Sequence, residues 1–288
     1  MQSKVILVSG ASSGFGRLAV SELLKRGHRV IAGVRGGEVR AKAIFSDHAA
    51  LWDKQLFAVD LHLENSKTFE TLTPLLNERF EGHLDVLVNN AGYGLFGSLE
   101  DQLPEQLRHQ FDVNFFGPAF LTRYLLPFLR PAKGRVLNVS SIVGLYAVPF
   151  YGSYSASKHA LEAMTESLRF ELAPFDVQVG LIQPGGFKTD FAGRSCVYAK
   201  GADLPSSLYT RRTHMLKRLF ETPSMRLALA NPARVSNLIA KRCEQARIPM
   251  RSIIGLDAWL LHFAARLIPD WVRVALTSLA FKKVVFRE

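Results

Sequence analysis

The chain has 288 residues, of which 48% are hydrophobic and 21% are charged. This composition is typical of a globular protein with a substantial core. The formal net charge of +11 is spread along the sequence, without a long Lys or Arg run or a nucleic-acid-binding motif. We therefore expect mainly solvated surface charges and no nucleic acid partner. Cys196 and Cys243 lie outside any metal-ligand spacing, which indicates thiols in a reducing compartment, or an isolated disulfide, and no metal site.

The first residues run directly into a predicted strand, without the apolar segment and cleavage site of a secretory signal. No run of about 18 or more uncharged apolar residues occurs, which argues against a membrane-spanning helix. We therefore expect a cytoplasmic protein.

The N-terminal segment has the pattern of a strand, a glycine-rich turn and a helix. Residues 4–9 (KVILVS) predict a buried parallel strand, and residues 17–27 (RLAVSELLKRG) predict an amphipathic helix. The turn GASSGFG between them contains Gly10, Gly14 and Gly16. Glycine lets the backbone approach a pyrophosphate closely, and the N-terminus of the following helix favours its charge. The segment therefore predicts a dinucleotide site, with a turn that binds no ligand as the alternative.

The second and third strands bear on the type of dinucleotide. The strand at 29–34 ends without an acidic residue and is followed by Arg35. An acidic residue at this point binds the ribose hydroxyls of NAD, whereas an arginine accommodates the extra phosphate of NADP. The sequence therefore favours NADP(H), although a solvated arginine would give the same pattern. The strand at 55–59 leads to Asp60 and Leu61, where a carboxylate can reach the adenine.

Strands and helices alternate through the rest of the chain. This pattern predicts an α/β fold, a doubly wound parallel sheet of about seven strands with helices on both faces, in one domain spanning residues 1–288. Loops at the carboxyl ends of such strands form the binding site, and Gly10, Asn89, Ser141 and Gly185 all follow predicted strands. The remaining predicted elements are helices at 64–80, 104–129 and up to about 173, and strands at 84–88, 135–139, 177–182 and 251–255.

The stretch YGSYSASK contains Tyr154 and Lys158, which are four residues apart and so share one face of a predicted helix. A lysine held beside a tyrosine favours the phenolate and lowers the tyrosine pKa. The tyrosine then becomes a proton donor and acceptor near neutral pH. Such pairs also occur on solvated helix faces, so the pair becomes a catalytic candidate because a cofactor turn accompanies it.

Six segments together resemble the short-chain dehydrogenase/reductase superfamily, in its short single-domain branch. They are SGASSGFG, NNAG, the Asn of DVNFFG, NVSS, YSASK and PGGFKT, in this order. The resemblance extends over nearly the whole chain. Residues 138–150 and 160–175 further resemble the branch that contains 17β-hydroxysteroid and retinol dehydrogenases.

The resemblance implies a role for each matching residue. Tyr154 would be the general acid in carbonyl reduction and the general base in alcohol oxidation, and Lys158 would lower its pKa and bind the nicotinamide ribose. Ser141 would polarise the substrate oxygen, and Asn114 would hold a water in a proton relay. The implied cofactor-binding residues are Gly10, Ser12, Ser13, Gly14, Gly16, Arg35, Asp60, Leu61, Asn89, Ala91, Gly92, Tyr154, Lys158, Pro184, Gly185, Phe187 and Thr189.

Within that set, the glycine turn would line the pyrophosphate, Asp60 would meet the adenine, and residues 184–189 would hold the nicotinamide. Residues 187–223 would form a substrate lid, and they interleave large apolar residues with basic ones. With Phe96 and Phe150 from other loops they predict an apolar pocket. We expect a bulky lipophilic ketone or alcohol, such as a steroid, retinoid or long-chain lipid. The basic residues either meet an anionic head group or are solvated.

Residues 256–288 predict an apolar helical extension with helices at 257–267 and 270–281. Tryptophans on an apolar face, with Lys282 and Lys283 beside them, are typical of a helix at a membrane surface. Peripheral membrane contact is one interpretation, and packing on the domain or on a second copy in a homo-oligomer is the other.

The sequence therefore predicts an NADP(H)-dependent oxidoreductase that interconverts a carbonyl and an alcohol, with a lipophilic small molecule as its substrate. One alternative is a non-enzymatic dinucleotide-binding sensor or scaffold, which loss of the tyrosine or the lysine would favour; both are present. The other is a sugar-nucleotide epimerase, which would need a different glycine spacing and a longer segment after the sixth strand.

Overall fold

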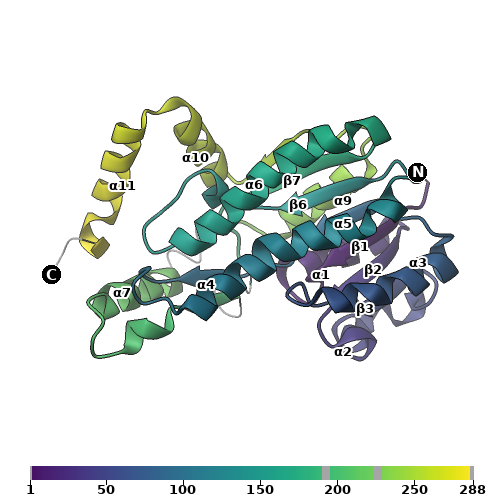
Figure 1. Cartoon of the computed structure of the whole chain (residues 1–288), viewed down its shortest axis with the longest axis horizontal. Helices are drawn as coiled ribbons and strands as arrows, with labels where there is room; N and C mark the ends of the chain where they lie inside the picture. The colour runs from purple at the N-terminus through teal and green to yellow at the C-terminus, as the bar shows by residue number, and fades with distance from the viewer. Residues whose placement is uncertain (1, 190–194, 223–228, 286–288) are drawn as a thin grey trace.

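The computed structural model describes residues 2–189, 195–222 and 229–285. In these residues seven parallel strands form one sheet in the order β3-β2-β1-β4-β6-β7-β9 (Figure 1). The predicted doubly wound parallel sheet is therefore confirmed. The strands are β1 Val5–Ser9, β2 Arg29–Val34, β3 Leu56–Asp60, β4 Val86–Asn89, β6 Arg135–Val139, β7 Gln178–Pro184 and β9 Arg251–Ile254.

The strands are apolar along their length because both faces of the sheet are covered. In β1, Ile6 and Val8 belong to one buried cluster, whereas Val5 and Leu7 belong to the other. Side chains alternate between the two faces of a strand, so a continuous apolar run needs helices on both sides.

Helices α1 and α9 supply buried side chains on one face of the sheet, and α3, α5 and α6 supply them on the other (Figure 1). The helices are α1 Gly14–Lys25, α2 Gly37–Ile44, α3 Leu72–Phe80, α4 Pro104–Phe111, α5 Gly117–Leu129, α6 Gly152–Leu172, α7 Thr210–Glu221, α9 Ala233–Glu244, α10 Leu256–Leu267 and α11 Asp270–Val285.

Two predicted helices are interrupted. The helix expected at 64–80 begins as the 3-10 helix Ser66–Thr71, capped by Asn65, and becomes α-helical only in α3. The helix expected at 104–129 contains the π-helical turn Asp112–Phe116 between α4 and α5. Apolar periodicity predicts that a segment is helical, but it does not reveal such local shifts in hydrogen bonding. Sequence reasoning also missed α2 and α9.

A small parallel sheet joins two distant segments. Strand β5, Gly94–Phe96, follows β4, and it pairs with β8, Cys196–Tyr198, in the segment expected to form a lid. The described part of that segment also contains the 3-10 helix Lys200–Asp203 and α7, whereas residues 190–194 and 223 of the expected lid lie outside the described residues.

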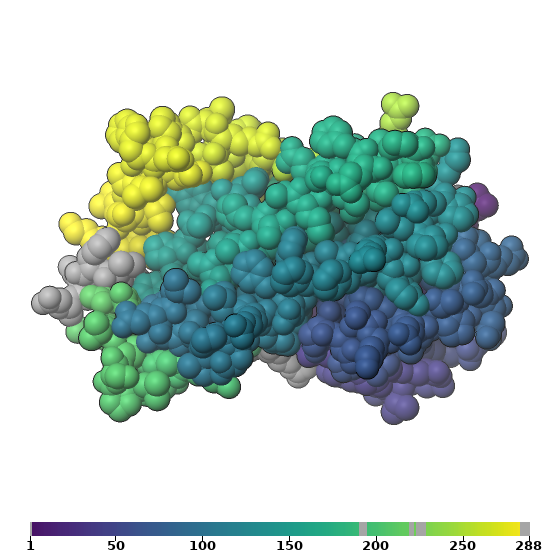
Figure 2. Space-filling model, in the orientation of Figure 1, coloured from purple at the N-terminus to yellow at the C-terminus, as the bar shows by residue number. Residues whose placement is uncertain are grey.

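The C-terminal helices α10 and α11 extend from the end of β9 away from the sheet (Figure 1). In Figure 2 their yellow surface stands above the teal and green surface at one end of the molecule. Among the residues described, no helix is both long enough and apolar enough to span a membrane. The two helices expose a set of large side chains that we call the C-terminal apolar surface: Leu256, Trp259, Leu260, Phe263, Leu267, Trp271, Val274, Leu276 and Leu279.

Candidate active site

The candidate residues gather at the carboxyl edge of the central strands. β1 lies between β2 and β4, so the chain leaves β1 toward one side of the sheet and β4 toward the other. This reversal of strand order opens a crevice, which is where open α/β sheets bind ligands. Gly10 follows β1, and Ser141 lies two residues after the end of β6.

The glycine turn forms an open cradle at the N-terminus of α1. Gly10 and Gly14 have φ angles of 65° and 52°, which favour glycine. Among the described residues, a Cβ on Gly14 would meet only the Thr189 Cβ, at 3.8 Å. The N-cap residue Ser13 makes no side-chain cap hydrogen bond, and the first turn of α1 contains no acidic residue. The positive end of the helix is therefore available to an anion, as a dinucleotide pyrophosphate requires.

The second of two adjacent asparagines supports this turn. Asn90 Nδ2 donates to the carbonyl oxygens of Ser9 and Gly10, at 3.0 and 3.2 Å. A Cβ on Gly10 would lie 2.6 Å from Ala91 Cα, so the two loops pack backbone against backbone. The Ser9 hydroxyl accepts hydrogen bonds from the backbone N–H groups of Asn90 and Ala91. These contacts explain the small residues of the NNAG segment.

Asn89, which we expected along the cofactor, directs its side chain into the interior. Its Nδ2 donates to Thr122 Oγ1 at 3.0 Å and to Asn138 Oδ1 at 2.8 Å, and the residue is 1% exposed. Asn138 in turn donates to Thr165 Oγ1. The side chain of Asn89 thus links β4 to β6 and α5.

Arg35 directly follows β2, and Asp60 is the last residue of the neighbouring strand β3. The Gly36 N–H donates to Asp60 Oδ1 at 2.8 Å. The Arg35 guanidinium is well exposed, and its only described ion pair is the 3.9 Å contact with Glu64. His62 Nε2 lies 3.0 Å from Asp60 Oδ1, and His62 Nδ1 lies 3.8 Å from Glu64 Oε1. The histidine therefore bridges the two carboxylates, a role that sequence reasoning missed.

Tyr154 is buried at the start of α6, and its phenol hydrogen-bonds with Ser141. Burial raises the pKa of Tyr154 to about 12, and the Ser141 hydrogen bond opposes this rise only in part. The expectation of a lowered pKa for Tyr154 beside Lys158 is therefore not met in the protein alone, because the loss of hydration on burial is the largest effect. The phenol is consequently protonated at neutral pH.

The side chains of Lys158 and Asn114 both lie close to Gly92. A Cβ on Gly92 would be 3.1 Å from Asn114 Oδ1 and 3.5 Å from Lys158 Nζ. Lys158 Nζ donates to the Val139 carbonyl at 2.9 Å, and burial lowers the pKa of this lysine to about 8. The side chain of Lys158 is thus held at the carboxyl end of β6, two residues before Ser141.

Asn114 occupies the centre of the π-helical turn and is fully buried. Its Oδ1 accepts from the Tyr93 N–H at 3.1 Å, and its Nδ2 donates to the Tyr93 carbonyl at 2.9 Å and to Ser157 Oγ at 3.2 Å. Asn114 therefore ties the loop after β4 to α6. Single π-helical turns within longer helices are frequent at functional sites.

Residues Pro184 to Thr189 form the loop expected to hold the nicotinamide. Phe187 packs edge-on against Phe15 of the glycine turn, with ring centroids 5.8 Å apart. At its other end the loop contacts α10, because the Gly186 N–H donates to Asp257 Oδ2 at 2.6 Å. The structure thus places this loop between the glycine turn and the C-terminal helices.

An aromatic cluster lies beside Tyr154. The Phe96 ring centroid is 4.2 Å from that of Tyr151, 6.0 Å from that of Tyr154 and 6.2 Å from that of Tyr198. Tyr198 comes from β8, so the β5–β8 pairing brings the expected lid to the candidate proton donor. Burial also raises the pKa of Tyr151. The surroundings of Tyr154 are therefore largely apolar.

The C-terminal helix α11 contacts the loop that follows Ser141. The Tyr146 hydroxyl and Thr277 Oγ1 are 2.5 Å apart, and the Arg273 guanidinium lies 5.6 Å from the Tyr146 ring centroid. Neither the contact of Tyr146 with α11 nor the hydrogen bond from Gly186 to Asp257 could be predicted from the sequence, because the partners are more than 60 residues apart.

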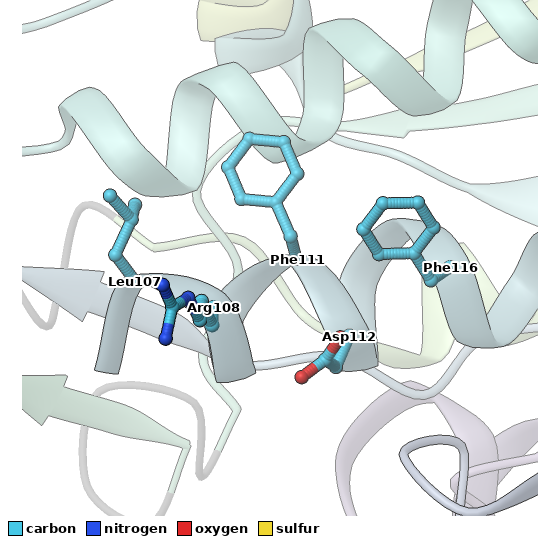
Figure 3. Close-up of a pocket in the computed structure, with 5 residues that line it drawn as sticks. All are labelled: Leu107, Arg108, Phe111, Asp112 and Phe116. Carbon is cyan, nitrogen blue, oxygen red and sulfur yellow. The ribbon is translucent and has the colours of Figure 1, made fainter. Parts of the chain in front are cut away.

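The described residues also contain a surface depression outside this site, and they contain no candidate metal site. A surface depression on α4 and the π-helical turn is lined by Leu107, Arg108, Phe111, Asp112 and Phe116 and contains no candidate catalytic residue (Figure 3). Within the described ranges, no cluster of His, Cys, Asp or Glu has the arrangement of a metal site.

Comparison with known proteins identifies the family. Residues 4–196 match the family model described as short chain dehydrogenase. The chain is 34% identical over 265 residues to a probable short-chain type dehydrogenase/reductase, VdlC, of Helicobacter pylori, covering 92% of this chain and 93% of the relative. It is 36% identical over 192 residues to a 3-ketodihydrosphingosine reductase of Bacteroides thetaiotaomicron, covering 66% of each protein.

Among solved structures, the chain is similar to a short chain dehydrogenase from Burkholderia cenocepacia in complex with NADP. The TM-score is 0.72 at 25% identity, and the alignment covers 99% of both chains. The glycine cradle, the Tyr-x-x-x-Lys helix and the strand order agree with this similarity. The chain therefore belongs to the short-chain dehydrogenase family of oxidoreductases.

Proposed function

We propose that the protein is an NADP(H)-dependent oxidoreductase that interconverts a carbonyl and an alcohol on a lipophilic substrate, with Tyr154 as the general acid and base. The observation that carries the proposal is the buried Tyr154–Ser141 hydrogen bond, with Lys158 and Asn114 nearby at Gly92 and the glycine turn in the same crevice.

Each of these residues has a distinct task. When bound, the cofactor would be the source of the hydride for the carbonyl carbon of the substrate. The Ser141 hydroxyl and the Tyr154 phenol donate hydrogen bonds to the carbonyl oxygen, where negative charge develops. Tyr154 then transfers its proton to that oxygen. Because burial keeps Tyr154 protonated at neutral pH, the group is already in the form that carbonyl reduction needs.

Lys158 and Asn114 restore the proton. The Lys158 ammonium has a pKa lowered to about 8, so it exchanges a proton readily near neutral pH. Asn114 lies beside it at Gly92, where its amide is suited to orienting a water between the lysine and solvent. When the cofactor is bound, Lys158 would also hold the nicotinamide ribose.

Support for NADP(H) comes from the exposed Arg35 at the end of β2. No acidic residue follows this strand directly, and Asp60 is occupied by the Gly36 N–H and His62. An extra phosphate on the adenine ribose would therefore meet a guanidinium whose ion pair within the described part of the chain is a 3.9 Å contact with Glu64. The Burkholderia neighbour that contains NADP has the same fold.

Support for a lipophilic substrate comes from the aromatic side chains at Tyr154. Phe96 lies beside Tyr154 and also contacts Tyr198, and Phe150 contacts Tyr209 of the proposed lid, residues 187–223, with ring centroids 6.1 Å apart. An apolar site of this kind favours a ketone or alcohol on a hydrocarbon skeleton. The relative from Bacteroides is named as a 3-ketodihydrosphingosine reductase.

We further propose that the C-terminal apolar surface contacts an anionic membrane, where such a substrate would reside. Its members Leu260 and Leu267 are 65% and 75% exposed. They are seven residues apart and therefore share one helix face. The exposed Arg266 lies on α10 and the exposed Lys282 lies on α11. Cations beside an apolar face favour binding to anionic lipid.

The catalytic proposal is tested with Tyr154→Phe. This change removes the phenolic proton and keeps the ring in its aromatic cluster, so turnover should fall at least a thousandfold, on the order expected for loss of an essential proton donor. The dissociation constant for NADPH should change little. Turnover is followed as NADPH oxidation with a panel of lipophilic ketones, and retained activity would overturn the assignment of Tyr154. Preferred turnover of small polar sugars would overturn the substrate class.

A further inference from the structure

We propose that Asp257 is a positioning residue that holds the loop Pro184 to Thr189 in place for the nicotinamide half of the cofactor. Asp257 lies in the first turn of α10, about 70 residues after that loop. The inference rests on the proposed function, because it assigns the loop to the nicotinamide.

The loop is bound to the C-terminal segment at two successive residues. The Gly185 N–H donates to the Ile254 carbonyl at 2.9 Å, which continues the β7–β9 pairing. The Gly186 N–H then donates to Asp257 Oδ2 at 2.6 Å. The backbone pairing of β7 with β9 ends at Gly185, and the next N–H group, that of Gly186, uses the Asp257 carboxylate as its acceptor. A carboxylate is a stronger acceptor than a neutral carbonyl.

The glycines around Asp257 show how closely the carboxylate approaches the backbone. A Cβ on Gly185 would lie 2.2 and 2.3 Å from the two Asp257 carboxylate oxygens. A Cβ on Gly255 would lie 2.5 Å from Oδ1, and the φ angle of Gly255 is 112°. Any other residue at position 185 would displace the carboxylate. The side chain of Asp257 therefore fits a space that these two glycines leave open.

From Gly186 the loop runs directly to the cofactor cradle. Phe187 packs against Phe15, and Thr189 lies beside Gly14. On its other edge the loop exchanges two backbone hydrogen bonds with Ala230, one to the Gly186 carbonyl and one from the Lys188 N–H. In the described residues, the Asp257 carboxylate accepts a hydrogen bond from this backbone. A substitution at position 257 removes this hydrogen bond without altering the main chain of the loop.

The expected consequence is selective for one half of the cofactor. Without the carboxylate, Gly186 loses a charge-assisted hydrogen bond and the following residues lose their fixed position. NADP+ binding should then weaken about tenfold, which is the size expected for one such bond. The ligand 2′,5′-ADP contains only the adenine half and lacks the nicotinamide that this loop is proposed to hold, so it should bind as before.

The experiment compares Asp257→Ala and Asp257→Asn with the unchanged full chain by calorimetric titration with NADP+ and with 2′,5′-ADP. Asp257→Asn keeps an acceptor oxygen and should restore most of the NADP+ affinity. The matched control is Asp270→Ala, which removes an acidic residue from the first turn of α11. It should leave both affinities unchanged.

Unchanged 2′,5′-ADP binding also shows that a variant is folded. If Asp257→Ala does not fold, Asp257→Asn and Asp257→Ser are compared instead. The serine variant should then bind NADP+ more weakly than the asparagine variant does. If the Asp257 variants lost affinity for NADP+ and for 2′,5′-ADP equally, or kept the full affinity for NADP+, the positioning role would be overturned. If the unchanged protein prefers NAD+, the cofactor assignment fails instead, and the same variants are then compared with NAD+ and ADP-ribose.

Discussion

Lys158→Met should make the cofactor-free protein more stable while it abolishes turnover. Burial lowers the pKa of Lys158 from 10.5 to about 8. A difference of this size corresponds to about 3 kcal/mol of lost stability at neutral pH. The Val139 carbonyl, which accepts a hydrogen bond from Lys158 Nζ, loses its partner in the variant, at a cost of about 2 kcal/mol. The variant should therefore be more stable by about 1 kcal/mol at neutral pH.

The pH dependence of the stability difference separates the effect of the Lys158 charge from that of the lost hydrogen bond. Because the folded-state pKa of Lys158 lies below the unfolded-state value, the folded protein loses this proton first as pH rises. The destabilisation is fully present below the folded-state pKa of about 8 and disappears as pH approaches 10.5. The stability of the unchanged protein should therefore rise relative to that of Lys158→Met by about 2 kcal/mol between pH values of about 7.5 and 10.

Urea denaturation of the cofactor-free protein at these two pH values measures this change. Lys25→Met, which removes an exposed lysine from α1, serves as the control, because solvent screens its charge in both states. A stability difference between Lys158→Met and the unchanged protein that is the same at both pH values would refute the reasoning. It would mean that Lys158 is hydrated in the folded protein.

Arg35→Ala should weaken NADPH binding much more than NADH binding, because only NADPH carries the phosphate that Arg35 is placed to meet; equal effects in a fluorescence titration would refute the NADP(H) assignment. Leu260→Glu combined with Leu267→Glu should reduce co-sedimentation of the full chain with vesicles containing phosphatidylserine, since both side chains are exposed on α10. Val39→Glu, at an exposed residue on α2, should leave co-sedimentation unchanged, and equal pelleting of all three proteins would remove the membrane proposal.

Much of the fold could be predicted because local patterns encode it. The apolar runs of β1 and β2 require burial on both faces, and the glycine turn before α1 occupies φ values that other residues avoid. Alternation of such units leads to a parallel sheet with a site at the carboxyl edge. The order of the motifs was therefore sufficient to bring Gly10, Ser141 and Tyr154 to one region of the molecule.

The roles of individual side chains in that region were less predictable. Asn89 and Asn90 are adjacent and chemically identical, yet one faces the interior and the other supports the glycine turn. The direction of each depends on the strand pleat and on partners from β1 and β6. The spacing of Tyr154 and Lys158 suggested a lowered tyrosine pKa, whereas complete burial raises it. Burial depends on the packing of the whole chain, which no local spacing reveals.

The sequence by itself determined the strands of the large sheet, the glycine turn and the Tyr-x-x-x-Lys helix, and hence the chemistry that we propose for this protein. Only the tertiary structure decided that β5 pairs with β8, that the helix carrying Asn114 contains a π-helical turn, and that Asp257 binds the loop at Gly186. The physical reason is one of range. Backbone conformation and periodicity are properties of neighbouring residues, whereas these contacts join segments about 70 to 100 residues apart or depend on which side chains exclude water.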